Sequence, residues 1–472
     1  MNYRSLLNQY PLFSLIGKVA DRYGLEVYVV GGFVRDLFLQ RPCKDVDIVC
    51  VGDGVVLANH FAREIGVSKV AIFKKFGTAM LRWEEWQIEF VGARKESYLP
   101  NSRNPIVQPG SLKDDIFRRD FTINTLSLNL NQPTFGDLVD MCKGILDLDK
   151  GIIQTPLDPA QTFTDDPLRM LRAIRFANQL QFTILPVTWS AIQQEAYRML
   201  ILPQERITDE FNKILLSSTP DKGIDMLDQA GLLRYILPEM EALKKVDKIG
   251  QNSHKDNFKH TLQVVRNVAN VSDNLWLRWA ALLHDIAKPA TKGFDAKVGF
   301  TFHGHEKLGA KMVAPIFRRL KLPLKQEMRY VKKLVRLHLR HIPLIENDVT
   351  YSAIRRFIHD TGDELEDLIT LCRADITSHN PYKVKRYLSN FEKLEASIKA
   401  VEDSDRIRHL EPVIDGHQIM DIFQIDPCSK IGMIKSALKE AILEGQVSNQ
   451  RDELYPYVLK KGKELGLTPK SG

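Results

Sequence analysis

The sequence has few cysteines, no long apolar run and no repeated or low-complexity segment. Its 472 residues include five cysteines that lie far apart and form no CxxC pair, so neither a disulfide framework nor a thiolate zinc site is indicated. No apolar run approaches the roughly 20 residues that a membrane-spanning helix needs, and the N-terminus lacks the features of a secretory signal. These absences predict a cytoplasmic chain with reduced thiols and no membrane partner.

The charge balance is mild, but the histidines are unevenly placed. The net charge of +7 permits a polyanionic partner without requiring one. Nine of the 12 histidines fall between positions 254 and 379, where a uniform spread would place about three. With 44% hydrophobic and 26% charged residues, the chain is long enough for several cores. We therefore expect a multidomain protein with one histidine-rich region.

Changes in pattern divide the chain. Up to about residue 150, short apolar β-type runs such as VDIVCVG and TINTLSLNL (122–130) alternate with helical stretches, which indicates an α/β module. From Asp165 onward the pattern is helical almost throughout. We predict an α/β head, an all-α neck and body, a histidine-rich helical bundle and a helical tail, at residues 1–150, 151–245, 246–395 and 396–472. A polar, glycine-containing segment at 244–257 is typical of a domain boundary.

A glycine pair and an aspartate pair stand out in the first module. Gly31 and Gly32 follow the apolar strand VYVV and precede the helix-like FVRDLFL, and the next strand opens with Asp45 and Asp47. Paired glycines let the backbone approach a ligand, and amides at a helix N-terminus favour phosphate. Residues two apart on a strand point to the same side, so the two carboxylates converge. This arrangement favours Mg²⁺ bridging a nucleotide.

The succession of strand, glycine pair, helix, strand and DxD resembles the nucleotidyltransferase head of the polymerase-β superfamily. The segment GGFVRDLFLQRPCKDVDIV is similar to the tRNA nucleotidyltransferase and bacterial poly(A) polymerase branch. Further motifs of that branch follow in order: LKDDIFRRDFTINTLSLNL, FGDLVDMCKGILDLDKGIIQTP, DDPLRMLRAIRFANQL and ERITDEF. The resemblance implies a polymerase-β-like sheet and template-independent nucleotide addition.

The resemblance also implies roles for individual residues. Asp45 and Asp47 would hold the magnesium ions that act in catalysis, with Glu89 as a candidate third carboxylate. The triphosphate, further phosphate and ribose contacts would come from five residues: Gly31, Gly32, Arg35, Arg118 and Asp120.

The segment DDPLRMLRAIRF carries arginines at every third position. Arg169, Arg172 and Arg175 alternate with apolar residues, which predicts a basic stripe beside an apolar one on a single helix. The resemblance implies that all three contact the nucleotide and that Asp166 and Arg169 read its base. A carboxylate accepts from the exocyclic amine of C or A, and a guanidinium donates to a ring acceptor, so one pair accepts CTP and ATP and rejects UTP and GTP. Asp165 stands where the family more often has Glu.

The histidine-rich region contains an HD doublet within an ordered series of possible metal ligands. Imidazoles and carboxylates from several helices of a bundle suit a divalent metal. The series resembles the HD-domain metallophosphohydrolases, and the positions that match are His260, His284, Asp285, His305, His338 and Asp375. A second metal is possible through His305 and His338, and His303 could replace or assist His305. The identity of the metal stays open.

These resemblances together imply a tRNA nucleotidyltransferase that adds or repairs the 3′-terminal CCA of tRNA from CTP and ATP, releasing pyrophosphate, with a possible phosphohydrolase activity in the HD domain. The segment around GHQIMDIF is similar to the C-terminal unit of long CCA-adding enzymes, although Cys428 follows Pro427 where Gly is frequent.

Three alternatives remain open. A poly(A) polymerase shares the head motifs but generally has a basic extension in place of an HD domain. A split-activity enzyme would add only CC or only A, and the loop at 93–115 argues against addition of CC alone. The third alternative is an HD phosphohydrolase whose head merely binds nucleotide or RNA, which the intact Asp45, Asp47 and RRD motif disfavour.

Overall fold

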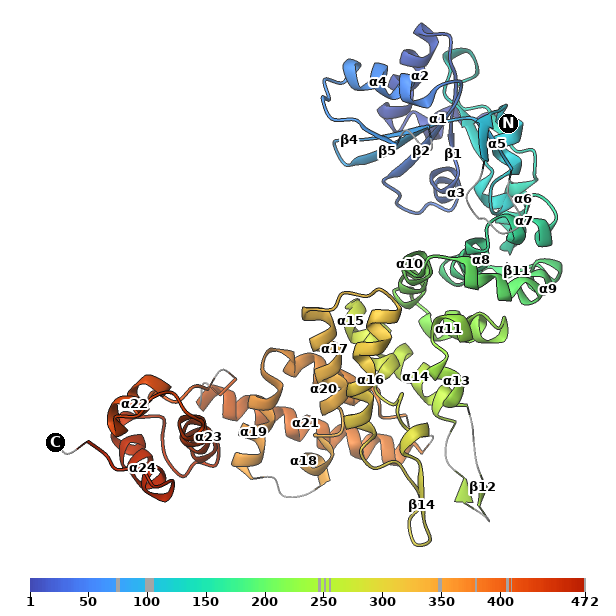
Figure 1. Ribbon diagram of the computed structural model, residues 1–472. Helices are drawn as coiled ribbons and strands as arrows, with labels where there is room; N and C mark the ends of the chain where they lie inside the picture. The colour runs from blue at the N-terminus through green and yellow to red at the C-terminus, as the bar shows by residue number, and fades with distance from the viewer. Residues whose placement is uncertain are drawn as a thin grey trace. The chain divides into compact units, whose positions relative to one another are not determined.

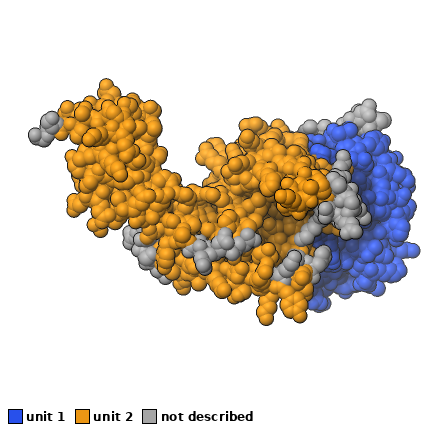
Figure 2. Space-filling view, turned by 90° about the horizontal axis from the view of Figure 1, so that it is seen from below, with its two compact units in different colours: residues 1–238 blue, residues 239–472 orange. Residues whose placement is uncertain are grey.

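The computed structural model describes two compact units, residues 1–238 and 239–472 (Figure 2). The described residues are 1–73, 77–97, 106–244, 248–249, 252–253, 256–346, 350–377, 380–404, 407–408 and 410–470. Residues 98–105 of the predicted loop and half of the predicted boundary at 244–257 lie outside them. Within the described residues, no helix is long and apolar enough to cross a membrane. The four-part division of the chain stays a prediction.

The first unit is built around a mixed seven-stranded sheet with the order β3-β4-β5-β2-β1-β8-β9. β2 and β5 are parallel, and the other neighbours are antiparallel. The strands are β1 (Glu26–Val30), β2 (Asp45–Val51), β3 (Ala71–Phe73), β4 (Thr78–Trp83), β5 (Trp86–Gly92), β8 (Ser127–Asn129) and β9 (Leu138–Val139). The predicted α/β head is confirmed.

Buried apolar residues explain why the central strands form. Val27, Val29 and Val30 of β1 are fully buried, as expected of a strand covered on both faces. Helix α2 (Pro11–Arg22) contacts α4 (Gly54–Glu64), and α4 packs on β4 and β5 (Figure 1). The other elements of the head are α1 (Arg4–Leu7), α3 (Gly32–Phe38), the β6–β7 hairpin (Arg94–Ser97 and Ile106–Pro109), α5 (Leu112–Phe117) and α6 (Gly144–Lys150).

Only part of one apolar run in the head forms a strand, although the sequence predicts a strand for the whole run. In the segment 122–130, expected as β-type, Thr122–Asn124 forms a 3-10 turn and only Ser127–Asn129 pairs with β1. The hydroxyl of Thr122 donates to Asp147, and Asn124 contacts Asp120. These polar contacts hold the first part of the run out of the sheet.

The rest of the first unit is helical, as predicted, apart from a short parallel pair formed by β10 (Ile152–Ile153) and β11 (Thr183–Ile184). The helices are α7 (Pro159–Asp165), α8 (Leu168–Leu180), α9 (Pro186–Glu195), α10 (Gln204–Leu215), α11 (Pro220–Gln229) and α12 (Leu233–Ile236). Helix α8 contacts both α10 and α11, so it lies at the centre of this group.

The second unit contains a helical bundle and a helical tail. The bundle helices are α13 (Glu239–Ala242), α14 (Asn257–Ala269), α15 (Leu275–Leu283), α16 (His305–Arg319), α17 (Gln326–Leu337), α18 (Ile342–Glu346), α19 (Tyr351–Thr361) and α20 (Leu365–Ala374). Two short hairpins join them: β12–β13 (Lys248–Ile249 and Asn252–Ser253) and β14–β15 (Gly293–Asp295 and Gly299–Thr301). The tail helices are α22 (Gly416–Phe423), α23 (Ser429–Leu443) and α24 (Arg451–Glu464). The 24-residue helix α21 (Pro381–Ser404) runs through the boundary predicted at 395.

Candidate active site and metal centre

Three carboxylates gather on neighbouring strands of the head. Asp47 on β2 lies directly beside Glu89 on β5, and Asp45 lies beside Gln87 in the same parallel register. Burial, together with the charge of Asp45, raises the pKa of Asp47 against the opposing effect of Arg119. Burial and the charge of Asp47 raise the pKa of Glu89. The buried carboxylates therefore have too little positive charge around them to favour their ionised forms, and a divalent cation would supply that charge.

Gly31 forms a tight backbone turn beside these carboxylates. Its φ of 72° is a conformation that favours glycine. A Cβ atom there would lie 3.0 Å from Nη1 of Arg119 and 3.6 Å from Oδ2 of Asp47. Gly32 begins helix α3 and carries no such restriction. A backbone turn that only glycine suits therefore lies against the carboxylate and guanidinium groups, and these residues fit Mg²⁺ with a bound phosphate.

A buried hydrogen-bond chain links α3 to α8. Arg35 Nη1 donates to Asn124 Oδ1 at 2.8 Å, and Asn124 Nδ2 donates to Asp120 Oδ1 at 3.0 Å. Arg172 Nε donates to the other oxygen of Asp120 at 2.7 Å. Burial raises the pKa of Asp120, but Arg172 and Asn124 outweigh burial and hold that pKa well below its usual range. Asn124 thus connects the predicted residues Arg35, Asp120 and Arg172. The sequence reasoning did not single out Asn124.

A second network fixes the arginine pair of the RRD motif. The fully buried Asp115 accepts from Arg118 Nε at 3.0 Å through one oxygen and from Arg119 Nη2 at 2.8 Å through the other. Arg118 also pairs with Glu96 at 3.1 Å. Sequence reasoning missed Asp115 and Arg119. Their spacing of four residues at the end of a helix is the signal that predicts such a pair.

The predicted arginine stripe of α8 is engaged with other elements. Arg169 is 9% exposed, and its Nη2 donates to the backbone oxygen of Arg118 at 2.6 Å. Arg175 pairs with Glu210 of α10 at 2.6 Å, a partner that sequence reasoning missed although ERITDEF contains it. Asp166 precedes the helix and accepts from the N–H of Leu168 at 3.1 Å. The stripe thus ties the head motifs to the helical part of the first unit.

The second unit brings the predicted histidines and aspartates together. His260 lies in α14, and His305 begins α16. The other four residues directly follow helices: His284 and Asp285 follow α15, His338 follows α17, and Asp375 follows α20. Two groups have ligand atoms within 4.8 Å of one another: one contains His260, His284 and Asp285, and the other contains Asp285, His305 and His338. Asp285 belongs to both groups. These are the groups of this kind within the described part of the chain.

Each imidazole in the cluster is oriented through Nδ1. The Nδ1 atoms of His284, His305 and His338 lie 2.7 Å from the backbone oxygens three residues earlier. The Nε2 atoms consequently face the shared carboxylate, with His284 Nε2 3.2 Å from Asp285 Oδ2 and His305 Nε2 3.2 Å from Asp285 Oδ1. Such outer hydrogen bonds fix the ring orientation of metal-binding histidines.

Asp375 and His260 complete the first group. His260 Nε2 lies 2.9 Å from Asp375 Oδ1, and His260 Nδ1 lies 2.7 Å from the hydroxyl of Thr377. Asp375 Oδ1 is also 3.6 Å from His284 Nε2. The six residues predicted from the sequence therefore share one site.

Two buried atoms of this site, His284 Nε2 and Asp285 Oδ2, lie 3.2 Å apart. Burial lowers the pKa of His284, but Asp285 and Asp375 raise it to about 10, and burial lowers that of His338 to about 3. Lys288 Nζ lies 2.5 Å from Asp285 Oδ2. Imidazole nitrogens and carboxylate oxygens that converge in a buried site are typical ligands of a divalent metal, so this donor set fits one.

A pocket of about 510 Å³ opens beside this cluster. Its lining includes His305 together with Lys288, His303, Arg336 and Arg340. His303 is exposed and lines the pocket, whereas the buried His305 belongs to the ligand group. The ligand position is therefore filled by His305, and an assisting role for His303 stays a prediction. The pocket gives an anionic ligand access to the cluster.

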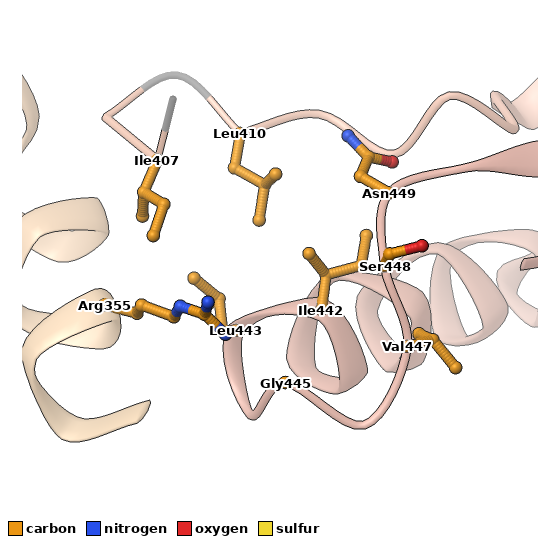
Figure 3. A pocket seen from close by; sticks show the side chains of 9 residues that line it. All are labelled: Arg355, Ile407, Leu410, Ile442, Leu443, Gly445, Val447, Ser448 and Asn449. Atoms are coloured by element: carbon orange, nitrogen blue, oxygen red, sulfur yellow. The ribbon is translucent and has the colours of Figure 1, made fainter. Parts of the chain in front are cut away.

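A separate cavity of about 370 Å³ lies between α19 and the end of α23 (Figure 3). Its walls are mainly apolar, with Ile407, Leu410 and Ile442 facing the guanidinium of Arg355 across the space (Figure 3). It contains none of the predicted site residues.

Three family models match the chain: "Poly A polymerase head domain" at residues 27–154, "Probable RNA and SrmB- binding site of polymerase A" at 181–244 and "HD domain" at 257–380. The carboxylate strands and the glycine turn lie in the first match, and the histidine cluster lies in the third. Fold and site together define a nucleotidyltransferase with an appended HD domain.

Similar proteins of assigned activity indicate the family of nucleotidyltransferases to which the chain belongs. The chain is 31% identical over 435 residues to an A-adding tRNA nucleotidyltransferase of Deinococcus radiodurans, covering 90% of this chain and 93% of the relative. It is 29% identical to a CC-adding tRNA nucleotidyltransferase of Thermus thermophilus, with coverage of 90% and 92%, and 26% identical to a CCA-adding enzyme of Streptococcus gordonii, with coverage of 93% and 94%. The chain belongs to the tRNA nucleotidyltransferase family.

A solved structure agrees in fold. A CCA-adding enzyme in an apo form superposes with a TM-score of 0.66 at 23% identity, covering 98% of this chain and 97% of the other.

Proposed function

We propose that this enzyme completes or repairs the 3′-terminal CCA of tRNA from CTP and ATP without a nucleic-acid template. The observation that carries the proposal is the set of Asp45, Asp47 and Glu89 on adjacent strands beside the glycine turn at Gly31. Such a set suits phosphoryl transfer, and family membership supplies tRNA as the acceptor.

The chain's own residues position the nucleotide in this proposal. With Mg²⁺ held by Asp45 and Asp47, the site gains the charge that orients a triphosphate and activates a hydroxyl. The RNA 3′-oxygen bonds to the α-phosphorus, the bond to the bridging oxygen breaks, pyrophosphate leaves, and the hydroxyl proton passes to solvent. Gly31, Gly32, Arg35 and Arg118 contact the triphosphate, and Asp120 contacts the ribose.

Base selection falls to Asp166 and Arg169 at the start of α8. One carboxylate oxygen of Asp166 caps the helix, which leaves the other to accept from the exocyclic amine of C or A. Arg169 is held by the backbone oxygen of Arg118. Because that oxygen belongs to the RRD motif, base reading and phosphate binding are mechanically joined. Arg172 and Arg175 support the same surface through Asp120 and Glu210.

The histidine cluster supports a second activity, hydrolysis of a phosphoester. His260, His284, Asp285 and Asp375 would hold one divalent metal, and Asp285, His305 and His338 a second. The convergence of the Nε2 atoms of His284 and His305 on the buried carboxylate of Asp285 favours this assignment. With metal bound, the site can supply a hydroxide at neutral pH. The water oxygen bonds to phosphorus, the bond from phosphorus to the ester oxygen breaks, and that oxygen takes the proton.

Addition of A alone is the main competitor, because the Deinococcus relative carries that name. Truncated tRNAs that lack one, two or all three terminal nucleotides, offered with labelled CTP and ATP singly and together, separate the activities. Ordered incorporation of C, C and A supports the proposal. A label from ATP on the CC-ended tRNA alone indicates an A-adding enzyme, and long A tails indicate a poly(A) polymerase.

The remaining parts of the proposal are organisational. We place the enzyme in the cytoplasm and retain the division into head (1–150), neck and body (151–245), HD domain (246–395) and tail (396–472). The body and tail would contact tRNA through its phosphates and its shape.

A further inference from the structure

The exposed face of helix α17 carries cations along its whole length. Arg329, Lys332 and Arg336 are exposed at spacings of three and four residues, and Arg340 follows in the next turn. These four residues form what we call the α17 basic face. The buried residues of the helix, Val331, Leu334 and Val335, lie on the opposite side. A helix in a bundle needs that apolar side but does not need an entirely basic outer side.

Neighbouring acids balance only two of the four cations of the basic face. Residues 305–337, which span α16 and α17, contain ten Lys and Arg against two Glu. Arg336 pairs with Glu306 and Arg340 with Asp360. Arg329 and Lys332 have no ion-pair partner among the residues that the structure describes. Like charges three and four apart destabilise a helix by about 0.2–0.5 kcal/mol per pair, so the face costs stability until an anion covers it.

The face leads into the pocket beside the histidine cluster. Arg336 and Arg340 line that pocket together with Lys288 and His305. From Arg336 back to Arg329 the helix rises about 10 Å, at 1.5 Å per residue. A single nucleotide in the pocket would leave that outer stretch uncovered, whereas an RNA strand would place further phosphates along it.

We propose that the α17 basic face binds the phosphate backbone of an RNA strand whose 3′-terminal phosphate lies in the pocket at the histidine cluster. This inference rests on the phosphohydrolase activity proposed above, and it names the substrate as the phosphorylated 3′ end of an RNA. A membrane surface fits less well because membrane-binding helices pair their cations with exposed apolar residues, and α17 itself exposes none of its large apolar side chains.

The test uses the full chain and short labelled RNAs that end in either a 3′-phosphate or a 3′-hydroxyl. Arg329→Gln/Lys332→Gln removes the two outer cations and leaves the pocket intact. Lys18→Gln/Arg63→Gln, two exposed cations on α2 and α4, is the matched control. We expect tighter binding of the phosphorylated RNA by the wild type. We expect about tenfold weaker binding by the α17 variant, with the salt dependence of log K reduced by about 1.4, or 0.7 for each lost phosphate contact.

Activity measurements distinguish the two proposals. Hydrolysis of the 3′-phosphorylated RNA should fall with binding in the α17 variant, while hydrolysis of p-nitrophenyl phosphate and addition of nucleotides to tRNA stay unchanged. Arg329→Lys/Lys332→Arg should restore RNA binding. If the wild type hydrolyses neither phosphoester, the phosphohydrolase proposal fails, and the binding data still decide the role of the face.

Three results would overturn the inference: unchanged RNA binding and salt slope in the α17 variant, an equal loss in the control variant, or a loss of nucleotide addition to tRNA in step with binding. The last result would mean that the α17 basic face binds the tRNA to which the head adds nucleotides. If the α17 basic face bound an acidic protein or an anionic vesicle in preference to RNA, that result would also overturn the inference.

Discussion

Asp115 holds two arginines that face different neighbours. Through one oxygen it fixes Arg118, which also meets Glu96, and through the other it fixes Arg119. The charge of Arg119 acts on Asp47, the central carboxylate of the head. A single buried carboxylate therefore positions the cations that surround the proposed triphosphate site, although it contacts no proposed ligand itself.

Asp115→Asn should destabilise the head, because it leaves two guanidiniums without their charged partner. Loss of a buried ion-pair partner costs about 3–5 kcal/mol. Burial raises the pKa of Asp115, but the two arginines lower it below its usual range, so its stabilising effect is complete above about pH 4 and is lost as the pH falls further. Urea unfolding should show a large difference from wild type at pH 7 that shrinks toward acid pH. Asp114→Asn, at an exposed neighbour, should do far less; a pH-independent difference would refute the assignment.

Arg169→Ala should relax base selection. A lost pair of base contacts is worth about 1–3 kcal/mol, so discrimination of CTP and ATP against UTP and GTP should fall about 10- to 100-fold. The ratios of kcat/KM for the four nucleotides on one truncated tRNA measure this. Arg169→Lys keeps the charge but not the planar donor geometry, and it should recover little selectivity. Equal loss of kcat/KM for all four nucleotides would make Arg169 a structural residue.

At the scale of elements, close backbone approach fixes how α4 lies on the sheet. A Cβ atom at Gly54 would lie 2.6 Å from the carbonyl carbon of Val91 in β5. The side chain of Asp53 caps the same helix by accepting from the N–H groups of Val55 and Val56. The start of α4 is thus held by a contact that only glycine permits and by a cap.

Gly54→Ala should therefore lower the stability of the head by about 1–3 kcal/mol through overpacking. Gly432→Ala is the matched control, since nothing lies within 4 Å of a Cβ atom there and α23 is helical at that point. It should stabilise the tail by about 0.5–1 kcal/mol. Thermal unfolding of both variants should shift in opposite directions; shifts of the same sign would contradict the packing argument.

Elements with a strong pattern could be predicted, and those set by distant polar contacts could not. β1 and β2 are apolar enough to read as buried strands, and α14–α17 carry clear helical periodicity. The turn at 122–124 escaped prediction because its conformation depends on Asp147 and Asp120, which no local pattern reveals. The choice of His305 over His303 depends on the start of α16, where Nδ1 of His305 meets the oxygen of Phe302. Motif order predicted the ligand types. The helical spacing of Asp115 and Arg119 contained a signal for that pair, but the partners Asn124 and Glu210 required the fold.

At the scale of the whole molecule, two chemistries lie in separate compact units. The carboxylate site belongs to residues 1–238 and the histidine cluster to residues 239–472. Each unit has its own buried core. A change at one site should therefore leave the other intact, which is the basis for assigning the activities independently.

Asp47→Ala should abolish nucleotide addition while preserving the metal content and any hydrolysis of the second unit. Asp285→Ala should do the reverse, because it removes the one carboxylate shared by both ligand groups. Elemental analysis of the purified variants, alongside both activity assays, measures this separation. Loss of both activities in either variant would show that the units depend on each other structurally.

The most direct test of the account is the 3′-end sequence of the product. A tRNA that lacks all three terminal nucleotides is incubated with the enzyme and all four nucleoside triphosphates, and the extended ends are sequenced. We predict that products end in CCA and extend no further, and that Asp47→Ala yields no extension. Ends extended with U or G, runs of A, or a tRNA extended only when CC is already present would contradict CCA addition by this chain.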